Sequence, residues 1–215
     1  MGSALAASRR AAFSAGVSSG LLSYLVLFGS LFVTPFFLEN GRGLSAAAAG
    51  ACLTALSVAT ALVSPLAGRL ADAVSARLLT VAGMLVSAVA LALLAAQHGA
   101  TVRVVVGLAL LGLGIGLFVP ANNAAIMSSV PREQLGAASG MLNMARSLGT
   151  ALELSLTGRV FAAVAGARAR PELVSRGYTA AMLFLAALSL VAALLAAARR
   201  EGRLHPDAHA VVNPI

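Results

Sequence analysis

Residues 104–129 have the sequence VVVGLALLGLGIGLFVPANNAAIMSS, which contains no Asp, Glu, Lys or Arg. A helix needs about 20 apolar residues to cross the hydrocarbon core of a bilayer, so this stretch predicts a membrane-spanning helix. The whole chain agrees with that interpretation, because 60% of its 215 residues are hydrophobic and only 10% are charged. So little charge cannot cover the surface of a soluble globular protein. A soluble enzyme or a disordered protein is therefore not expected.

Similar apolar stretches lie on both sides of this one and predict an all-α membrane protein with six transmembrane helices. We expect an N-terminal tail over residues 1–16, a six-helix transmembrane region over residues 17–198 and a C-terminal tail over residues 199–215. Pro120 is expected to interrupt the fourth helix. The predicted spans cover about residues 17–38, 46–67, 79–97, 104–129, 137–165 and 177–198.

The basic residues predict how the chain is oriented. All fifteen are arginines, and they are scattered between the apolar runs, which favours loop charges over a nucleic-acid-binding face. Six spans place both termini on one side of the bilayer, together with eight arginines, against five on the other side. Because arginine is enriched in cytoplasmic loops, both termini are predicted to be cytoplasmic.

The fifth predicted span carries two charges, Arg146 and Glu153. Seven residues make about two helical turns, so these side chains share a face with Asn143 and Thr150. Charge inside a span is costly, and this face should border a bundle interior or an aqueous cavity. Two interpretations of Glu153 stay open. It is either a structural partner of Arg146 or of a neighbouring helix, or a carboxyl group that takes up and releases a proton.

Polar and small residues of the fourth span form a second candidate group. Asn122 and Asn123 point about 100° apart, so at most one of them can face a cavity squarely, and an interhelical hydrogen bond is the alternative role. Small residues let membrane helices approach closely. We find no nucleophile–base pair, metal-binding cluster or phosphate-binding loop, so neither an enzyme nor a metal or cofactor is expected. The small residues are Gly112, Gly114 and Gly116 in this span and Gly136 and Gly140 at the start of the next.

Taken together, these residues resemble the major facilitator superfamily, and most closely the C-terminal half of the fourteen-helix drug:proton antiporters. The resemblance extends over about residues 17–195. A second, less specific part resembles the cytoplasmic loop motif of the superfamily, although Ala73 and Ser75 depart from it. The specific part is Gly112-x-Gly114-x-Gly116-x-x-x-Pro120-x-Asn122-Asn123, then Val130-Pro131 and Gly136-x-x-Ser139-Gly140-Met141-Leu142-Asn143-x-x-Arg146-x-Leu148-Gly149. The loop motif is Gly68, Arg69 and Asp72 with Arg77.

The resemblance implies one major-facilitator lobe in a bacterial inner membrane, with the first three and last three helices as inverted repeats. It implies proton-coupled efflux of small amphipathic or cationic compounds by a half-size or partial carrier, completed by a second six-helix lobe from another copy or another chain. The alternative is a non-transporting truncated lobe or a modulatory membrane subunit of a full-length carrier. The family often has Gly at the position of Glu153, so its role rests on the residue analysis. The candidate cavity or proton-coupling residues are Glu153, Arg146, Asn143, Thr150, Asn122 and Asn123.

Overall fold

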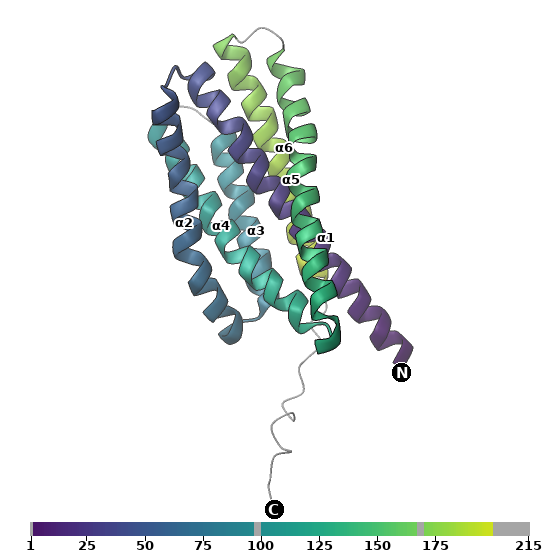
Figure 1. The fold of residues 1–215 in the computed structure, drawn as a ribbon. Helices are drawn as coiled ribbons and strands as arrows, with labels where there is room; N and C mark the ends of the chain where they lie inside the picture. Colours follow the sequence, from purple (N-terminus) through teal and green to yellow (C-terminus); the bar gives the residue numbers. More distant parts are fainter. Residues whose placement is uncertain (1, 97–99, 167–169, 200–215) are drawn as a thin grey trace, which may run out of the picture.

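The computed structural model describes residues 2–96, 100–166 and 170–199, with the backbone alone for residues 2–12 and 71–73. Within these ranges the structure is helical and has no strand, and six helices are long and apolar enough to cross a membrane. This confirms the predicted all-α, six-helix membrane fold (Figure 1). The elements are α1 (Gly2–Phe36), a π-helical turn (Phe37–Gly41), α2 (Ala46–Ala73), α3 (Ala76–Ala95), α4 (Thr101–Ser128), a 3-10 turn (Arg132–Gln134), α5 (Leu135–Ala165) and α6 (Pro171–Ala198).

The first and fourth helices differ from what the sequence predicts. The predicted N-terminal tail is helical from Gly2, because its Ala- and Arg-rich sequence favours a helix and has no Pro to stop it. The predicted interruption of the fourth span is wrong, because α4 continues through Pro120 to Ser128. Neighbouring helices make such a proline tolerable within a membrane span. Residues 200–215 of the predicted C-terminal tail lie outside the described part of the chain.

The second helix extends beyond the predicted end of its span at about residue 67, because α2 continues to Ala73. Gly68 and Arg69 lie on the exposed surface of this helix, and the backbone of Asp72 lies in its last turn. A single glycine costs a helix only about 1 kcal/mol, which the apolar residues around it offset by packing.

The chain turns instead at Val74 and Ser75. The Ser75 hydroxyl accepts a hydrogen bond of 3.1 Å from the Leu78 amide and so caps α3. Arg77 lies in the first turn of α3. The departure of Ser75 from the family motif therefore has a local structural role, as the N-cap of a helix.

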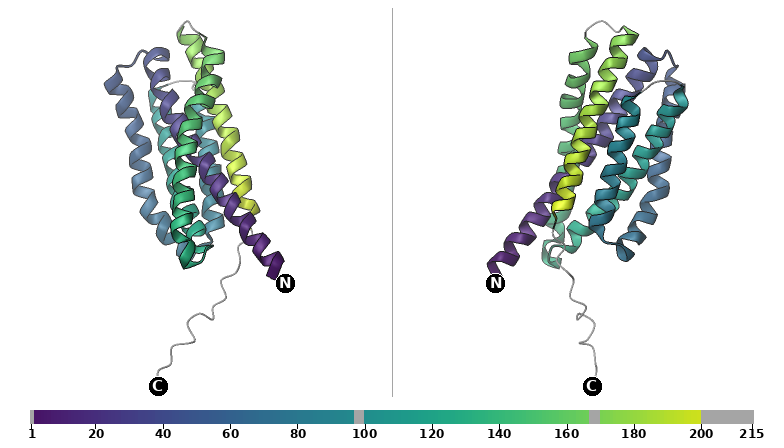
Figure 2. Two further views of the ribbon diagram at one scale, coloured as in Figure 1. Left: turned by 45° about the vertical axis from the view of Figure 1, so that its right-hand side comes forward. Right: turned by 180° about the vertical axis from the view of Figure 1, so that it is seen from behind.

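The six helices pack as two groups of three. In one group α4 packs against α2 and α3, and in the other α1 packs against α5 and α6. The groups join where α3 meets α6 and where α1 meets α4 (Figure 2). Exchanging α1 with α4, α2 with α5 and α3 with α6 converts the contacts of α4 with α2 and α3 into those of α1 with α5 and α6. The contact of α5 with α6 has no equally extensive counterpart between α2 and α3. The exchange relates the first three helices to the last three, as internal repeats would, and each group takes helices from both.

Glycines allow α4 to lie unusually close to its neighbours. A Cβ atom at Gly112 would collide with the carbonyl oxygen of Leu56 on α2, and one at Gly114 would collide with the Ser87 hydroxyl on α3. Gly83 on α3 and Gly114 approach each other reciprocally, because a Cβ at either would lie 2.6 Å from the other's carbonyl oxygen. This is the close packing through small residues that stabilises helix pairs in membranes.

The two helices at the ends of the arrangement, α2 and α5, are the least buried. Only 11% of the central window of α2 and 22% of that of α5 is buried, against 44–56% for the other four helices. The exposed leucines of α3 and α6, such as Leu93 and Leu194, suit contact with lipid. On α5 the exposed residues include Asn143 and Arg146, which do not suit lipid contact.

We expect Gly112→Ala to destabilise the fold by about 1–3 kcal/mol, because the new methyl group would press on the α2 backbone. The matched control is Gly140→Ala on α5, where nothing lies within 4 Å of the added Cβ. It should leave stability unchanged or raise it by up to about 1 kcal/mol, since Ala favours a helix over Gly. SDS titration in mixed micelles, with labelling of the single Cys52 as the reporter, measures both. Equal effects of the two changes would contradict the close packing at Gly112.

Candidate functional site

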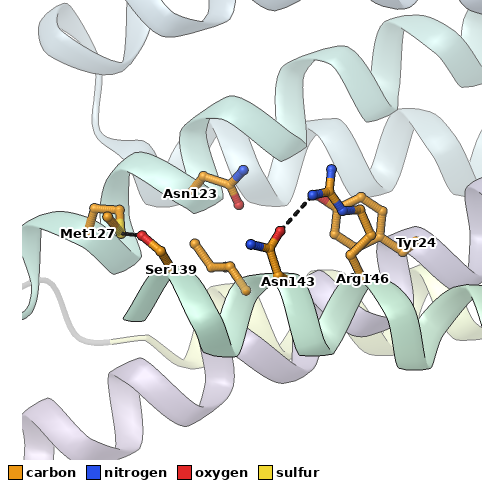
Figure 3. Close-up of a pocket in the computed structure, with 7 residues that line it drawn as sticks. Tyr24, Asn123, Met127, Ser139, Asn143 and Arg146 are labelled. Atoms are coloured by element: carbon orange, nitrogen blue, oxygen red, sulfur yellow. Dashed lines mark hydrogen bonds between the residues drawn. The ribbon is translucent and has the colours of Figure 1, made fainter. Parts of the chain in front are cut away.

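A pocket of about 270 Å³ opens between α1, α4 and α5. Three of its lining residues were predicted from the sequence, namely Asn123, Asn143 and Arg146. Figure 3 shows their side chains grouped between the first half of α5 and the second half of α4, with Tyr24 of α1 behind Arg146. The lining residues are Tyr24, Asn123, Met127, Ser139, Leu142, Asn143 and Arg146.

Arg146 is held in this pocket by two contacts. Its Nη2 donates a hydrogen bond of 2.6 Å to the Asn143 side-chain oxygen one turn earlier on α5. Its guanidinium carbon lies 5.9 Å from the centre of the Tyr24 ring, which is within the range of a cation–π interaction. The Arg146 guanidinium is therefore held by the Tyr24 ring and by the Asn143 side-chain oxygen. Among the described residues that line the pocket, none is a carboxylate.

Glu153 lies away from the pocket, inside the helix bundle. Its side chain is 7% exposed, and its Oε2 is buried without a hydrogen-bond partner. Thr157, one turn further along α5, is fully buried, and its hydroxyl also lacks a partner. Among the described residues these are the buried side-chain polar atoms left unsatisfied. Such groups are rare in folded proteins and call for an explanation.

The contact that separates the two charges is Gly149. A Cβ at this position would lie 2.6 Å from the Leu21 carbonyl oxygen and 3.0 Å from the Tyr24 Cβ, so α5 touches the α1 backbone here. Before Gly149, Asn143 and Arg146 are exposed, and beyond it Glu153 is buried. The predicted polar face of α5 thus exists, but it divides into an open part and an enclosed part.

The structure also shows how Glu153 and Thr150 lie relative to Arg146. No ion pair joins Arg146 to Glu153 in the described structure, because the only recorded hydrogen bond of the guanidinium goes to Asn143. The Thr150 hydroxyl donates to the Arg146 carbonyl oxygen of its own helix, at 2.9 Å. Thr150 does not line the pocket. Ser and Thr commonly satisfy their hydroxyls in this way inside helices.

The two adjacent amides of α4 have different surroundings. Asn123 lines the pocket, whereas Asn122 is 1% exposed and lies within the bundle. The Asn122 amide nitrogen donates to the Gly16 carbonyl oxygen of α1 at 3.1 Å, and its oxygen accepts from Arg199 at 2.7 Å. Asn122 thus makes the interhelical hydrogen bond that the sequence analysis offered as one alternative. Asn123 lies at the pocket, where the other alternative would place it.

Sequence reasoning missed Tyr24 and Arg199. Arg199 was assigned to the C-terminal tail, yet its side chain is 7% exposed and lies against Gly16. Arg199 follows directly after an apolar span, and nothing in the sequence indicates that its side chain lies inside the helix bundle. Tyr24 is one of only two tyrosines in the chain, and its position within the first span was the available signal for a polar aromatic group inside the membrane.

Comparison with known proteins identifies the family. The model of the Major Facilitator Superfamily matches residues 16–211. The chain belongs to the Major Facilitator Superfamily. This membership agrees with the six-helix fold.

Named relatives of this superfamily member are transporters of several kinds. The chain is 33% identical to the multidrug resistance protein Stp of Mycobacterium tuberculosis over 151 residues, which are 70% of this chain and 28% of the relative. It is 32% identical to the riboflavin transporter RibZ of Clostridioides difficile over 153 residues, 70% of this chain and 33% of the relative. It is 28% identical to the multidrug transporter MdtP of Bacillus subtilis over 157 residues, 72% and 29% respectively. The matched part spans about a third of the length of these relatives.

We expect Asn122→Ala to destabilise the lobe by about 1–3 kcal/mol, because it removes a buried acceptor from Arg199 and a donor from the Gly16 carbonyl. The neighbouring change Asn123→Ala should alter stability by no more than about 0.5 kcal/mol, because Asn123 borders the pocket. The same SDS titration compares the two variants. A larger loss for Asn123→Ala would contradict these assignments.

Proposed function

We propose that this chain is one six-helix lobe of a proton-coupled exporter of small amphipathic compounds. The observation that carries the proposal is the divided face of α5, with an open polar pocket at Arg146 and an enclosed, unpartnered carboxyl group at Glu153. The first part can receive a substrate, and the second can exchange a proton. The names of the relatives, which include two multidrug proteins and a riboflavin transporter, support a small organic substrate.

The surroundings of Glu153 support the proposed proton-exchanging role. A carboxylate without a donor or a cation beside it is costly to bury, and a role in proton exchange would account for a carboxyl group at this position. The titratable or charged residues of α1 and α6 whose side chains the structure describes are Tyr24, Glu172, Arg176 and Tyr178, and none is hydrogen-bonded to Glu153.

A second six-helix lobe is part of the proposal. Arg146 and Asn143 are exposed on the sparsely buried helix α5, and lipid would not suit these two polar side chains. The relatives are about three times as long as the matched segment, which leaves room in them for another such lobe. The second lobe, from another copy or another chain, would cover Arg146 and Asn143 and close the pocket.

We also propose that the lobe lies in a bacterial inner membrane with both termini in the cytoplasm. The start of α1 and the end of α6 lie at the same end of the bundle (Figure 1). The arginine count of eight against five favours that side as the cytoplasmic one. Arg69, one of the eight, is exposed near the end of α2.

We expect Glu153→Gln to keep expression and folding and to abolish proton-driven efflux, because glutamine preserves the shape but cannot titrate. The matched control is Glu133→Gln, which removes an exposed carboxyl group from the turn before α5 and should leave efflux intact. Efflux from vesicles under an imposed pH gradient, with the second lobe present, measures both. Unchanged pH-dependent efflux in Glu153→Gln would leave Glu153 with a structural role alone.

We expect a single copy of the chain to be inactive as a carrier, because its polar face stays open without a second lobe. Stepwise photobleaching of labelled Cys52 in vesicles counts the copies, and efflux from the same preparations reports activity. Activity should appear only in assemblies that hold two six-helix lobes. Transport by preparations that contain strictly monomeric chain would overturn this part of the proposal.

A further inference from the structure

The pocket at Arg146 has a charge that distinguishes between classes of substrate. Among the residues that the structure describes, its lining includes one guanidinium and no carboxylate. The nearest acid on the same helix, Glu153, lies about 10.5 Å further along the axis and is buried behind the Gly149 contact. The pocket is therefore electropositive, which opposes the binding of an organic cation.

The aromatic surface of the pocket also disfavours the binding of an organic cation. An organic cation is commonly held over the face of a tyrosine or tryptophan. Here the Arg146 guanidinium already covers the Tyr24 ring, at 5.9 Å from its centre, and the chain has no tryptophan. An incoming cation would have to displace an internal one.

Arg146 retains the capacity to bind an anion. A guanidinium carries five N–H donors in a planar fork, and the structure records one of them in a hydrogen bond, to Asn143. The hydrogen bond to Asn143 and the contact with the Tyr24 ring hold the Arg146 guanidinium at an exposed surface. Its other N–H groups can donate to a ligand. Arginine in this situation pairs well with a carboxylate, often through two parallel hydrogen bonds.

The rest of the lining suits a flat, partly apolar body. Met127 and Leu142 supply apolar surface, and the amide of Asn123 supplies a further donor and acceptor. A cavity of about 270 Å³ has room for one or two fused rings. We propose that this pocket selects planar aromatic carboxylates over neutral or cationic compounds of the same shape, with Arg146 as the residue that binds the carboxylate. This inference rests on the proposed export of small amphipathic compounds and names their class.

The test uses three probes that share one ring system and differ in charge: 2-naphthoate, 2-naphthamide and 2-naphthylmethylammonium. Binding to the full chain in phosphatidylcholine nanodiscs is followed by naphthyl fluorescence, which no tryptophan obscures. Empty nanodiscs correct for partition into lipid. We expect 2-naphthoate to bind at least about tenfold more tightly than either other probe, as a charge-assisted hydrogen bond allows.

Variants identify the residue responsible. Arg146→Gln should abolish the preference for 2-naphthoate, and Arg146→Lys should reduce it, because lysine keeps the charge and loses the planar fork. The matched control is Arg159→Gln, which removes the same charge from an exposed position of α5 outside the pocket and should preserve the preference. If Arg146→Gln fails to fold, the reduced preference for 2-naphthoate that we expect in Arg146→Lys is the test.

Three outcomes would overturn the inference: equal binding of the three probes, tighter binding of the cation, or a preference that survives both changes at Arg146. The absence of binding by every probe would overturn it as well. Failure of the proposed function looks different, because selective binding in nanodiscs needs no transport. Selective binding without proton-driven efflux would overturn the exporter proposal alone, and efflux of cations without anion preference would overturn this inference alone.

Discussion

The close approach of α4 to its neighbours is the constraint on which the rest of the lobe depends. In a bilayer the hydrophobic effect does not drive helices together, and association rests on tight packing and hydrogen bonds. Gly83 and Gly114 supply that packing between α3 and α4 by letting each backbone reach the other. The position of α4 then decides where Asn122 and Asn123 point. One becomes a buried link to α1 and Arg199, and the other borders the pocket.

Both ends of the lobe are fastened by specific side-chain contacts. At the end that holds the start of α1, Asn122 and Arg199 connect α4, α1 and α6. At the opposite end, the Phe37 and Tyr178 rings stack with their centres 4.1 Å apart and join the π-helical turn to α6. Between these ends most hydroxyls donate to backbone carbonyls, as Ser189 does to Met84 of α3 at 2.7 Å. In such a satisfied interior, the unpartnered Glu153 and Thr157 are exceptions that packing alone does not explain.

The sequence was sufficient to predict the number and class of the helices, because apolar length and charge are properties of each segment alone. It was not sufficient to predict their partners. Gly112 and Gly114 look like Gly136 and Gly140 in the sequence, yet the first pair touches neighbouring helices and the second faces open space. Helical spacing likewise placed Arg146 and Glu153 on one face of α5. Only the contact of α1 with Gly149 shows that this face is exposed at Arg146 and buried at Glu153. Arg199 was missed because its burial depends on a gap beside Gly16 that belongs to a distant helix.

The crossing at Gly149 also joins the two candidate functions mechanically. Arg146 and Glu153 are seven residues apart on one continuous helix, which puts them within about 20° of each other around its axis. A rigid rotation or tilt of α5 that opens Glu153 to water must therefore also move Arg146 against Tyr24 and Asn123. Although α5 is among the least buried helices of the lobe, such a motion would also have to rearrange its packing on α1 and α6. Arg146, which would bind the substrate, and Glu153, which would exchange the proton, therefore cannot change their surroundings independently. Movement of α5 alone would be enough to couple substrate binding to proton exchange.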